Sequence, residues 1–231
     1  MLGCPVRNRD WILPKYLEHI YNLNFPKGNL SLCFIINDST DKTFDLLIDF
    51  KRKNAREYGS ILLVNMDLGQ IEDKRTSAVR REIYKGLAEL RNVLLDVANQ
   101  ENVDYLFSVD SDILVPQFAL TSLILSKKDI VSGQIWNDPS KTFPNIMIKK
   151  DGKYIHYKNF PRESLFPCDV TGAVYLLKKE VIQNVRYAFH PLGEDVAFCE
   201  NAQEKGFSIW CNSAVTCEHI LRSEDYYVRS N

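Results

Sequence analysis

The feature that most constrains the fold is the regular alternation, in the first half of the chain, of short apolar runs with longer amphipathic stretches. The apolar runs predict strands at residues 2–6, 31–36, 61–65 and 105–109. The stretches between them predict helices at about 10–23, 40–58 and 79–98. This order is typical of an α/β fold in which helices connect the strands of a mostly parallel sheet.

The second half continues the alternation after an interruption. Pro116 is expected to start a helix, and a fifth strand follows at 129–136. Residues 137–166 differ in being rich in proline, lysine and aromatics, so we expect an insertion over one edge of the sheet, with a hairpin at Asp151-Gly152. We therefore expect a single domain over 1–231, with one half at 1–115 and the other at 116–231.

The charge balance, the cysteines and the length of the apolar runs limit the partners and the cellular location that we expect. The chain has 29 Lys+Arg and 30 Asp+Glu, a net charge of −1, which argues against nucleic acid as a partner. Six cysteines lie scattered in apolar runs and are expected to be structural thiols, with a zinc site at Cys211 and Cys217 as a minor alternative. Neither a signal peptide nor a transmembrane segment is expected. The expected location is cytoplasmic, with peripheral membrane attachment as an alternative.

The strongest motif is YLFSVDSDILVP, in which Asp110 and Asp112 follow a buried strand. Carboxylates at that point project into the crevice where open α/β sheets bind ligands. They can hold Mg2+ or Mn2+, and His219 is a candidate third ligand because Mn2+ also accepts imidazole. The alternatives are a solvated acidic turn for the two aspartates and a packed or surface position for the histidine.

A second acidic pair, Glu194-Asp195, opens a predicted helix after Gly193. One interpretation is a general base at the mouth of the crevice, which would remove a proton from an attacking hydroxyl. The other is favourable placement of acidic side chains at the start of a helix, with no catalytic role.

Two further features are a pair of arginines on one predicted helix and an aspartate at the end of a predicted strand. Arg80 and Arg91 share the helix stripe that should face the sheet, where they would either form buried ion pairs or contact a diphosphate or base. Asp38 ends the second predicted strand, where it would either accept hydrogen bonds from a ribose or base or cap the next helix.

Seven segments in order resemble the GT-A fold glycosyltransferases, most closely the family 2 group: GCPVRNR, IINDSTDKT, LAELRN, SVDSDI (a D-x-D motif), TGAVYLLKKEVI, GEDVAFC and CEHI. The stretch from Arg80 through ELRNVLL to DSDILVP and IVSGQIW is also similar to the Anp1-type mannosyltransferases. Two departures stand out. Asn37-Asp38-Ser39 replaces the commoner double aspartate and glycine, and the absence of Q-x-x-R-W after the ED pair argues against a processive synthase.

The resemblance implies a role for each matching position. The nucleotide-sugar would contact Pro5, Val6, Arg7, Asp38, Arg80, Arg91, Asp110 and Ser111, with Thr171, Gly172 and Ala173 beneath the sugar. The metal, Mn2+ or Mg2+, would bind Asp110, Asp112 and His219. Asp195, with Glu194 beside it, would be the general base of an inverting reaction. The likeness to Anp1 points instead to a retaining reaction, in which Asp195 would have a different role.

The resulting hypothesis is a metal-dependent hexosyltransferase that moves a sugar from a nucleoside-diphosphate-sugar donor to a hydroxyl of a glycan, lipid-linked or protein acceptor. A homodimer is compatible with it. Aromatic residues of the insertion would stack on acceptor sugars, with packing or dimer contact as the alternative: Trp136, Phe143, Tyr154, Tyr157 and Phe160. Two other functions are a haloacid-dehalogenase-type phosphatase with Asp110 as nucleophile and a non-catalytic nucleotide-sugar-binding domain.

Overall fold

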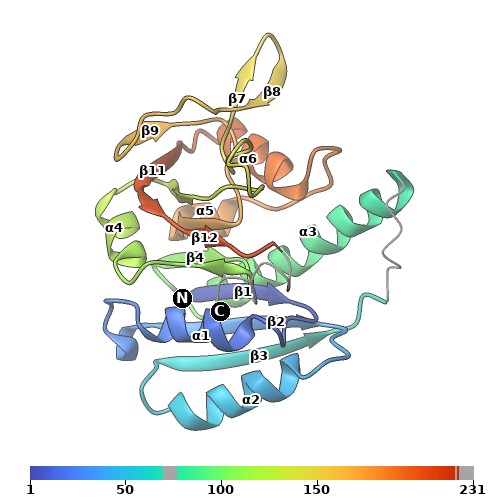
Figure 1. Cartoon of the computed structure of the whole chain (residues 1–231), viewed down its shortest axis with the longest axis vertical. Coiled ribbons are helices and arrows are strands. Elements are labelled where there is room, and N and C mark those ends of the chain that lie inside the picture. Colours follow the sequence, from blue (N-terminus) through green and yellow to red (C-terminus); the bar gives the residue numbers. More distant parts are fainter. Residues whose placement is uncertain (70–76, 222, 224–231) are drawn as a thin grey trace.

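An eight-stranded sheet forms the centre of the protein in a computed structural model that describes residues 1–69, 77–221 and 223 (Figure 1). Its strands lie in the order β3-β2-β1-β4-β10-β6-β11-β9. In chain order they are β1 (Leu2–Val6), β2 (Ser31–Asn37), β3 (Ser60–Met66), β4 (Tyr105–Val109), β6 (Ile130–Gln134), β9 (Leu165–Pro167), β10 (Val174–Lys178) and β11 (Ile209–Thr216).

The sheet is mixed and mostly parallel, as the sequence predicts. Strands β1, β2, β3 and β4 run parallel to one another. Strand β10 is antiparallel to both β4 and β6, β11 is parallel to β6, and β9 is antiparallel to β11. The carboxyl ends of β1, β2 and β4 therefore meet at one edge, which is where a parallel sheet places its ligand crevice.

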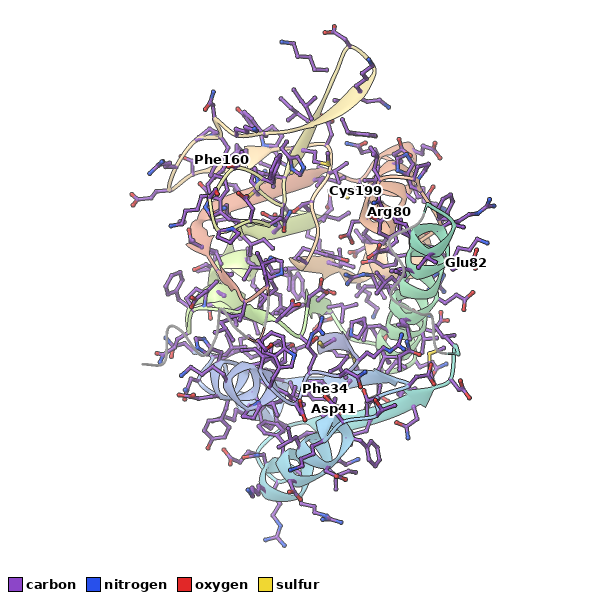
Figure 2. All side chains as sticks on the ribbon, turned by 45° about the vertical axis from the view of Figure 1, so that its right-hand side comes forward. Phe34, Asp41, Arg80, Glu82, Phe160 and Cys199 are labelled. Atoms are coloured by element: carbon purple, nitrogen blue, oxygen red, sulfur yellow. The ribbon has the colours of Figure 1, made fainter. Side chains whose placement is uncertain are left out.

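Helices cover both faces of the sheet. One face carries α1 (Leu13–Tyr21), α2 (Thr43–Asn54) and α4 (Ala119–Leu125), and the other carries α3 (Ser77–Gln100), α5 (Lys179–Asn184) and α6 (Glu194–Glu204). Strand β2 shows the consequence, since Leu32, Phe34 and Ile36 enter the first core and Cys33 and Ile35 the second. Figure 2 shows Phe34 in this buried layer.

Helix α3 packs closely on β1 because Gly3 has no side chain. A Cβ at Gly3 would lie 2.9 Å from Leu94 Cγ, so even an alanine there would displace the Leu94 side chain from its place against the sheet. This contact fixes the buried face of α3 and with it the direction of Arg91, one turn earlier.

The starts of α1 and α2 are tied together by a pair of aspartates. The sequence predicts that Asp10 caps α1, but the helix begins at Leu13, with Pro14 in its first turn as expected. Asp10 N–H instead donates to Asp41 Oδ2 at 3.0 Å, and Asp41 Oδ1 accepts from Thr43 N–H at 2.9 Å. The chain leaving β1 is thereby held against the start of α2.

The predicted insertion forms a projecting hairpin, β7 (Met147–Lys150) and β8 (Lys153–His156), at the top of Figure 1. Its turn has φ of 50° at Asp151 and 74° at Gly152, the signature of a two-residue hairpin turn. The hairpin is anchored to α6 by a hydrogen bond of 2.8 Å from the Tyr154 hydroxyl to Glu200.

Several aromatic residues of the insertion pack against one another. The rings of Trp136 and Phe160 lie 5.8 Å apart, and Phe160 and Tyr157 both contact Phe166. This supports the packing interpretation for those three residues over a role in binding sugars.

Two short strands, β5 (Ile113–Leu114) and β12 (Glu218–His219), pair beside the crevice, and Lys27–Asn29 form a 3-10 turn. All six cysteines are buried free thiols. Among the helices of the described part of the chain, none is long and apolar enough to cross a membrane.

Candidate active site

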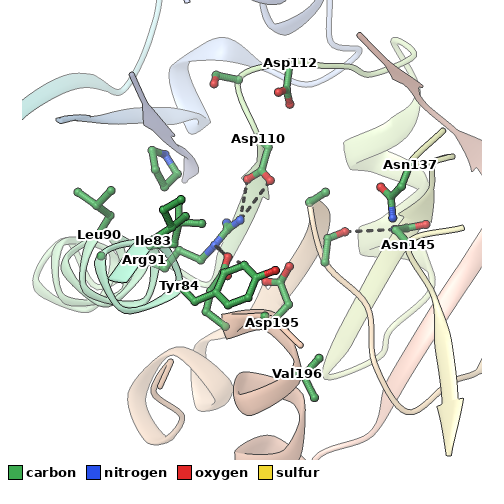
Figure 3. Close-up of a pocket in the computed structure, with 18 of the residues that line it drawn as sticks. Ile83, Tyr84, Leu90, Arg91, Asp110, Asp112, Asn137, Asn145, Asp195 and Val196 are labelled. Carbon is green, nitrogen blue, oxygen red and sulfur yellow. Dashed lines mark hydrogen bonds and ion pairs between the residues drawn. The ribbon is translucent and has the colours of Figure 1, made fainter. Parts of the chain in front are cut away.

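A cavity of about 780 Å³ opens at the carboxyl ends of β1, β2 and β4 (Figure 3). This volume lies in the range of small-molecule sites. In Figure 3, Ile83 and Leu90 lie on one side, Asn137 and Asn145 on the other, and Asp110 and Asp195 between them. The cavity thus has an apolar end, an acidic centre and a polar far end.

The apolar end is a slot between the loop after β1 and the buried stripe of α3. It is lined by Pro5, Leu68, Ile83, Leu87 and Leu90, with Val6 and Arg7 next to it in sequence. Asn37, the last residue of β2, also lines the cavity. Its side-chain oxygen is buried and has no hydrogen-bond partner among the described residues, which is unusual for a buried polar atom.

The acidic centre is organised around Arg91, which is 4% exposed. Its Nη2 donates to both carboxylate oxygens of Asp110, at 2.9 and 3.1 Å, and its Nε donates to Glu194 Oε1 at 3.0 Å. Of the two interpretations of this arginine, the structure shows the buried ion pair, although Arg91 also lines the cavity.

Asp112 lies apart from this network, toward the other side of the D-x-D turn in Figure 3. Its Oδ2 accepts from Arg9 Nη2 at 3.2 Å, and its Oδ1 lies 3.7 Å from His219 Nε2. Register places His219 opposite Ile113 in the β5–β12 pair, which explains how a residue so distant in sequence reaches the motif. Burial, countered in part by Arg9 and His219, raises the pKa of Asp112.

These groups fit a divalent cation in part. Carboxylate and imidazole suit Mn2+, and His219 turns Nε2 toward Asp112 Oδ1 at 3.7 Å. In the described chain, however, no three His, Cys, Asp or Glu side chains are grouped for a metal, because Asp110 is turned toward Arg91. The fitting pair is therefore Asp112 and His219.

Asp195 sits at the first turn of α6, between Arg91 and the cavity. Its Oδ1 is 3.9 Å from Arg91 Nε and 3.5 Å from the hydroxyl of Tyr175. Desolvation raises the pKa of Asp195 to about 8, although Arg91 opposes the shift, and 26% of the side chain is still accessible. A carboxyl with such a pKa can exchange a proton near neutral pH.

The cavity floor is formed by Thr171, Gly172 and Ala173. Asp110 N–H donates to Ala173 O at 2.8 Å, which joins the floor to the D-x-D turn. A Cβ at Gly172 would lie 2.6 Å from Asp195 Cγ, so the absence of a side chain there makes room for this carboxylate. Asn145 Nδ2 supports the floor from below by donating to Gly172 O at 3.1 Å.

Most of the predicted site residues line this one cavity. They are Pro5, Val6, Arg7, Arg91, Asp110, Ser111, Asp112, Thr171, Gly172, Ala173, Glu194, Asp195 and His219.

Two predicted residues lie elsewhere. Arg80 was expected on the stripe facing the sheet, but it is exposed near the start of α3, where the helix runs beyond the sheet (Figures 1 and 2). The buried face therefore begins only farther along the helix. Asp38 has φ of 47°, and its Oδ2 accepts from Leu68 N–H at 3.0 Å, so it shapes the wall of the slot while Asn37 lines the cavity.

The cavity also contains residues that sequence reasoning missed: Arg9, Asn37, Asn137, Asn145 and His156. Asn37 directly follows the strand predicted at 31–36 and could have been found by the rule that pointed to Asp38. Arg9 is part of the RNR run after the first strand. The other three have no local signal, because their position depends on how the insertion folds back over the sheet.

Comparison with known proteins gives distant relatives. The chain is 21% identical to chicken procollagen-lysine,2-oxoglutarate 5-dioxygenase 1, covering 98% of this chain and 30% of that protein. It is 23% identical to the mouse inactive glycosyltransferase 25 family member 3, over 83% of this chain and 34% of that protein. It is 24% identical to the mannan polymerase II complex ANP1 subunit of Saccharomyces cerevisiae, over 59% of this chain and 30% of that protein. The chain thus spans about a third of the length of these relatives.

Among solved structures, a mannosyltransferase from Pyrobaculum calidifontis, in complex with GDP-Man and Mn2+, superposes with a TM-score of 0.59. The match covers 99% of this chain and 58% of that one at 14% identity, which shows a shared GT-A fold. The Anp1 family model matches residues 1–150. Because that match covers more than half of the sequence, the chain belongs to the Anp1 family.

Proposed function

We propose that this protein is a metal-dependent glycosyltransferase that moves a sugar from a nucleoside-diphosphate-sugar donor to an acceptor hydroxyl. The observation that carries the proposal is the order of groups along one cavity: an apolar slot, the Asp110–Asp112 turn, and then Asp195. That order matches the order of base, diphosphate and reacting sugar in such a donor. We assign donor binding mainly to 1–115 and acceptor binding and catalysis to 116–231.

The slot suits a nucleobase. Its apolar walls would pack on the ring, and the free oxygen of Asn37 would accept a hydrogen bond from a ring N–H. Ser111, which is 5% exposed and lines the cavity beside the two aspartates, is placed to contact the ribose or diphosphate.

Asp112 and His219 would hold Mn2+ or Mg2+. When bound, the cation would neutralise negative charge that develops on the departing diphosphate. The structural neighbour bound to GDP-Man and Mn2+ supports this use of the fold.

Asp195 is the proposed general base of an inverting reaction. Gly172 leaves the carboxylate room beside the floor on which the transferred sugar would lie. Glu194 cannot share the role as an independent base because its side chain is 6% exposed and its carboxylate is paired with Arg91. Its contribution is to hold Arg91, which in turn faces Asp195 and Asp110.

The far end of the cavity is the proposed acceptor region. It is lined by Asn137 and by Met147 and His156 from the hairpin, together with Leu192. His156 Nδ1 lies 2.8 Å from Pro144 O. Because that contact requires a donor at Nδ1, Nε2 carries the free lone pair and can accept a hydrogen bond from an acceptor hydroxyl.

The contacts of Asp110 count against the phosphatase alternative, because both oxygens of the would-be nucleophile accept from Arg91. The non-catalytic alternative is supported by the name of one relative, an inactive glycosyltransferase. Asp195 and its raised pKa favour catalysis over binding alone.

The test is a thermal-shift screen of UDP-, GDP-, CDP- and dTDP-sugars, starting with GDP-mannose, with and without Mn2+. A bound donor should raise the unfolding temperature only when Mn2+ is present, and Asp112→Asn should remove the shift. Slow hydrolysis of the same donor should then distinguish an enzyme from a binder. Full turnover by Asp112→Asn would refute the metal-dependent mechanism, and trapping of an acyl phosphate on Asp110 would favour the phosphatase.

A further inference from the structure

A second arginine, Arg9, reaches Asp112 from the loop after β1. Its Nη2 donates to Asp112 Oδ2 at 3.2 Å, and its Nη1 donates to Arg7 O at 3.4 Å. Its backbone N–H is fixed by a 2.7 Å hydrogen bond to Thr43 Oγ1. The guanidinium thus lies against the carboxylate that is proposed to bind the metal.

Arg9 is held much less completely than Arg91. Arg91 is 4% exposed and donates to Asp110, Ser108 and Glu194, so its position is fixed by three partners. The side chain of Arg9 is 33% exposed. Among the residues that the structure describes it has one carboxylate partner, and its Nε is buried with no hydrogen-bond partner. An unpaired buried N–H is unfavourable, so a new acceptor in the cavity would stabilise a different position of this guanidinium.

We propose that Arg9 is a built-in counter-ion for Asp112 that a divalent cation has to displace, and that the displaced guanidinium pairs with the donor's diphosphate. The inference rests on the proposed function, since it takes Asp112 and His219 as the cation site. Arg9 occupies Oδ2 and His219 faces Oδ1, so both oxygens of Asp112 have a neighbour before a cation arrives.

Two consequences follow from charge. Without nucleotide, a cation must break the Arg9–Asp112 pair and approach a guanidinium of the same sign, so its affinity is reduced. When nucleotide is bound, Arg9 can instead form a bidentate pair with the diphosphate, so it no longer competes with the cation for Asp112. Metal and nucleotide therefore strengthen each other's binding, and this coupling is reciprocal.

The experiment measures Mn2+ binding directly, from the electron paramagnetic resonance signal of free Mn2+, with no nucleotide, with UDP and with GDP. The variants are Arg9→Met and, as a second uncharged replacement that keeps hydrogen-bond donors, Arg9→Gln. Arg52→Met is the matched control, because Arg52 is exposed on α2 and pairs with Asp49, three residues earlier on the same helix. Circular dichroism confirms that each variant is folded.

Without nucleotide, Arg9→Met and Arg9→Gln should bind Mn2+ roughly tenfold more tightly than the unmodified protein, about the effect of one charge-assisted hydrogen bond. The enhancement of Mn2+ binding by UDP or GDP should shrink in both variants and persist in Arg52→Met. Unchanged or weaker Mn2+ binding by both Arg9 variants would overturn the role of Arg9 while leaving the metal site intact. Mn2+ binding that Asp112→Asn leaves unaffected would instead overturn the proposed metal site, and with it this inference.

Discussion

Arg91 donates from one nitrogen, Nη2, to both carboxylate oxygens of Asp110, at 2.9 and 3.1 Å. Since its Nε also binds Glu194, this arginine of α3 connects the end of β4 with the start of α6. The two halves of the proposed active site, donor and acceptor, thus share one buried cation. Both the stability of the chain and the geometry of the site depend on it.

Replacing Arg91 with methionine should therefore destabilise the protein by about 3–5 kcal/mol, because it leaves Glu194 and Asp110 without their buried partner. Urea unfolding measures this loss. Arg186→Met is the control: Arg186 forms a similarly short pair with Asp96, but at the surface, so about 1 kcal/mol or less is expected. Equal losses in the two variants would contradict a central role for the buried network.

The raised pKa of Asp195 predicts a pH dependence of transfer. A general base has to be ionised, and the pKa of this carboxyl is about 8, so the rate should increase as the pH rises through 8 and fall below it. The profile of kcat/KM against pH measures this. A rate that stays constant between pH 6 and 9 would rule out Asp195 as the base.

The free energy of unfolding should change with pH in the direction opposite to the transfer rate. Between its ordinary pKa of 3.8 and about 8, Asp195 binds a proton more tightly in the folded protein than in the unfolded chain. Its contribution to the free energy of unfolding therefore decreases as the pH rises through that window. Asp195→Asn removes this titration. The unfolding temperature of the variant should therefore rise relative to that of the unmodified protein as the pH increases from 5 to 8. Parallel curves for the two proteins would contradict the raised pKa.

Gly172 should tolerate no side chain. In Gly172→Ala the new Cβ would lie 2.6 Å from Asp195 Cγ, so the carboxylate has to move. We expect transfer to fall by a factor of about 100, the effect of a displacement of about 1 Å in a reacting group, while nucleotide binding is retained. Gly28→Ala is the control, since no atom of the described residues lies within 4 Å of a Cβ at that position. A normal rate in Gly172→Ala would show that Asp195 is not confined by the floor.

The parts of this structure that the sequence predicts are those set by local patterns. Strands 2–6 and 105–109 match β1 and β4, because each is a buried apolar run with a clear break after it. The hairpin at Asp151-Gly152 also follows from local turn chemistry. The fold class follows in turn, since alternating strands and helices leave few topologies open.

The sequence predicts less well wherever a residue's role depends on distant packing. Arg80 and Arg91 share a helical stripe, but only Arg91 is buried, because α3 extends past the edge of the sheet. Asn37 lines the cavity in place of the predicted Asp38, because the backbone turns into the left-handed region at Asp38. His156 reaches the cavity only through the folding of the whole insertion, which no local signal indicates.

His156 should affect the acceptor and not the donor. Its ring is held by Pro144 O through Nδ1 and by an edge contact with Phe143 at 5.3 Å, which presents Nε2 for a hydroxyl. His156→Ala should raise the KM for the acceptor roughly tenfold, the effect of one lost hydrogen bond, and leave donor hydrolysis by water unchanged. Lys153→Ala, an exposed change on the same hairpin, should alter neither value. If His156→Ala slowed hydrolysis and transfer equally, His156 would act on the donor, and the far end of the cavity would not be the acceptor region.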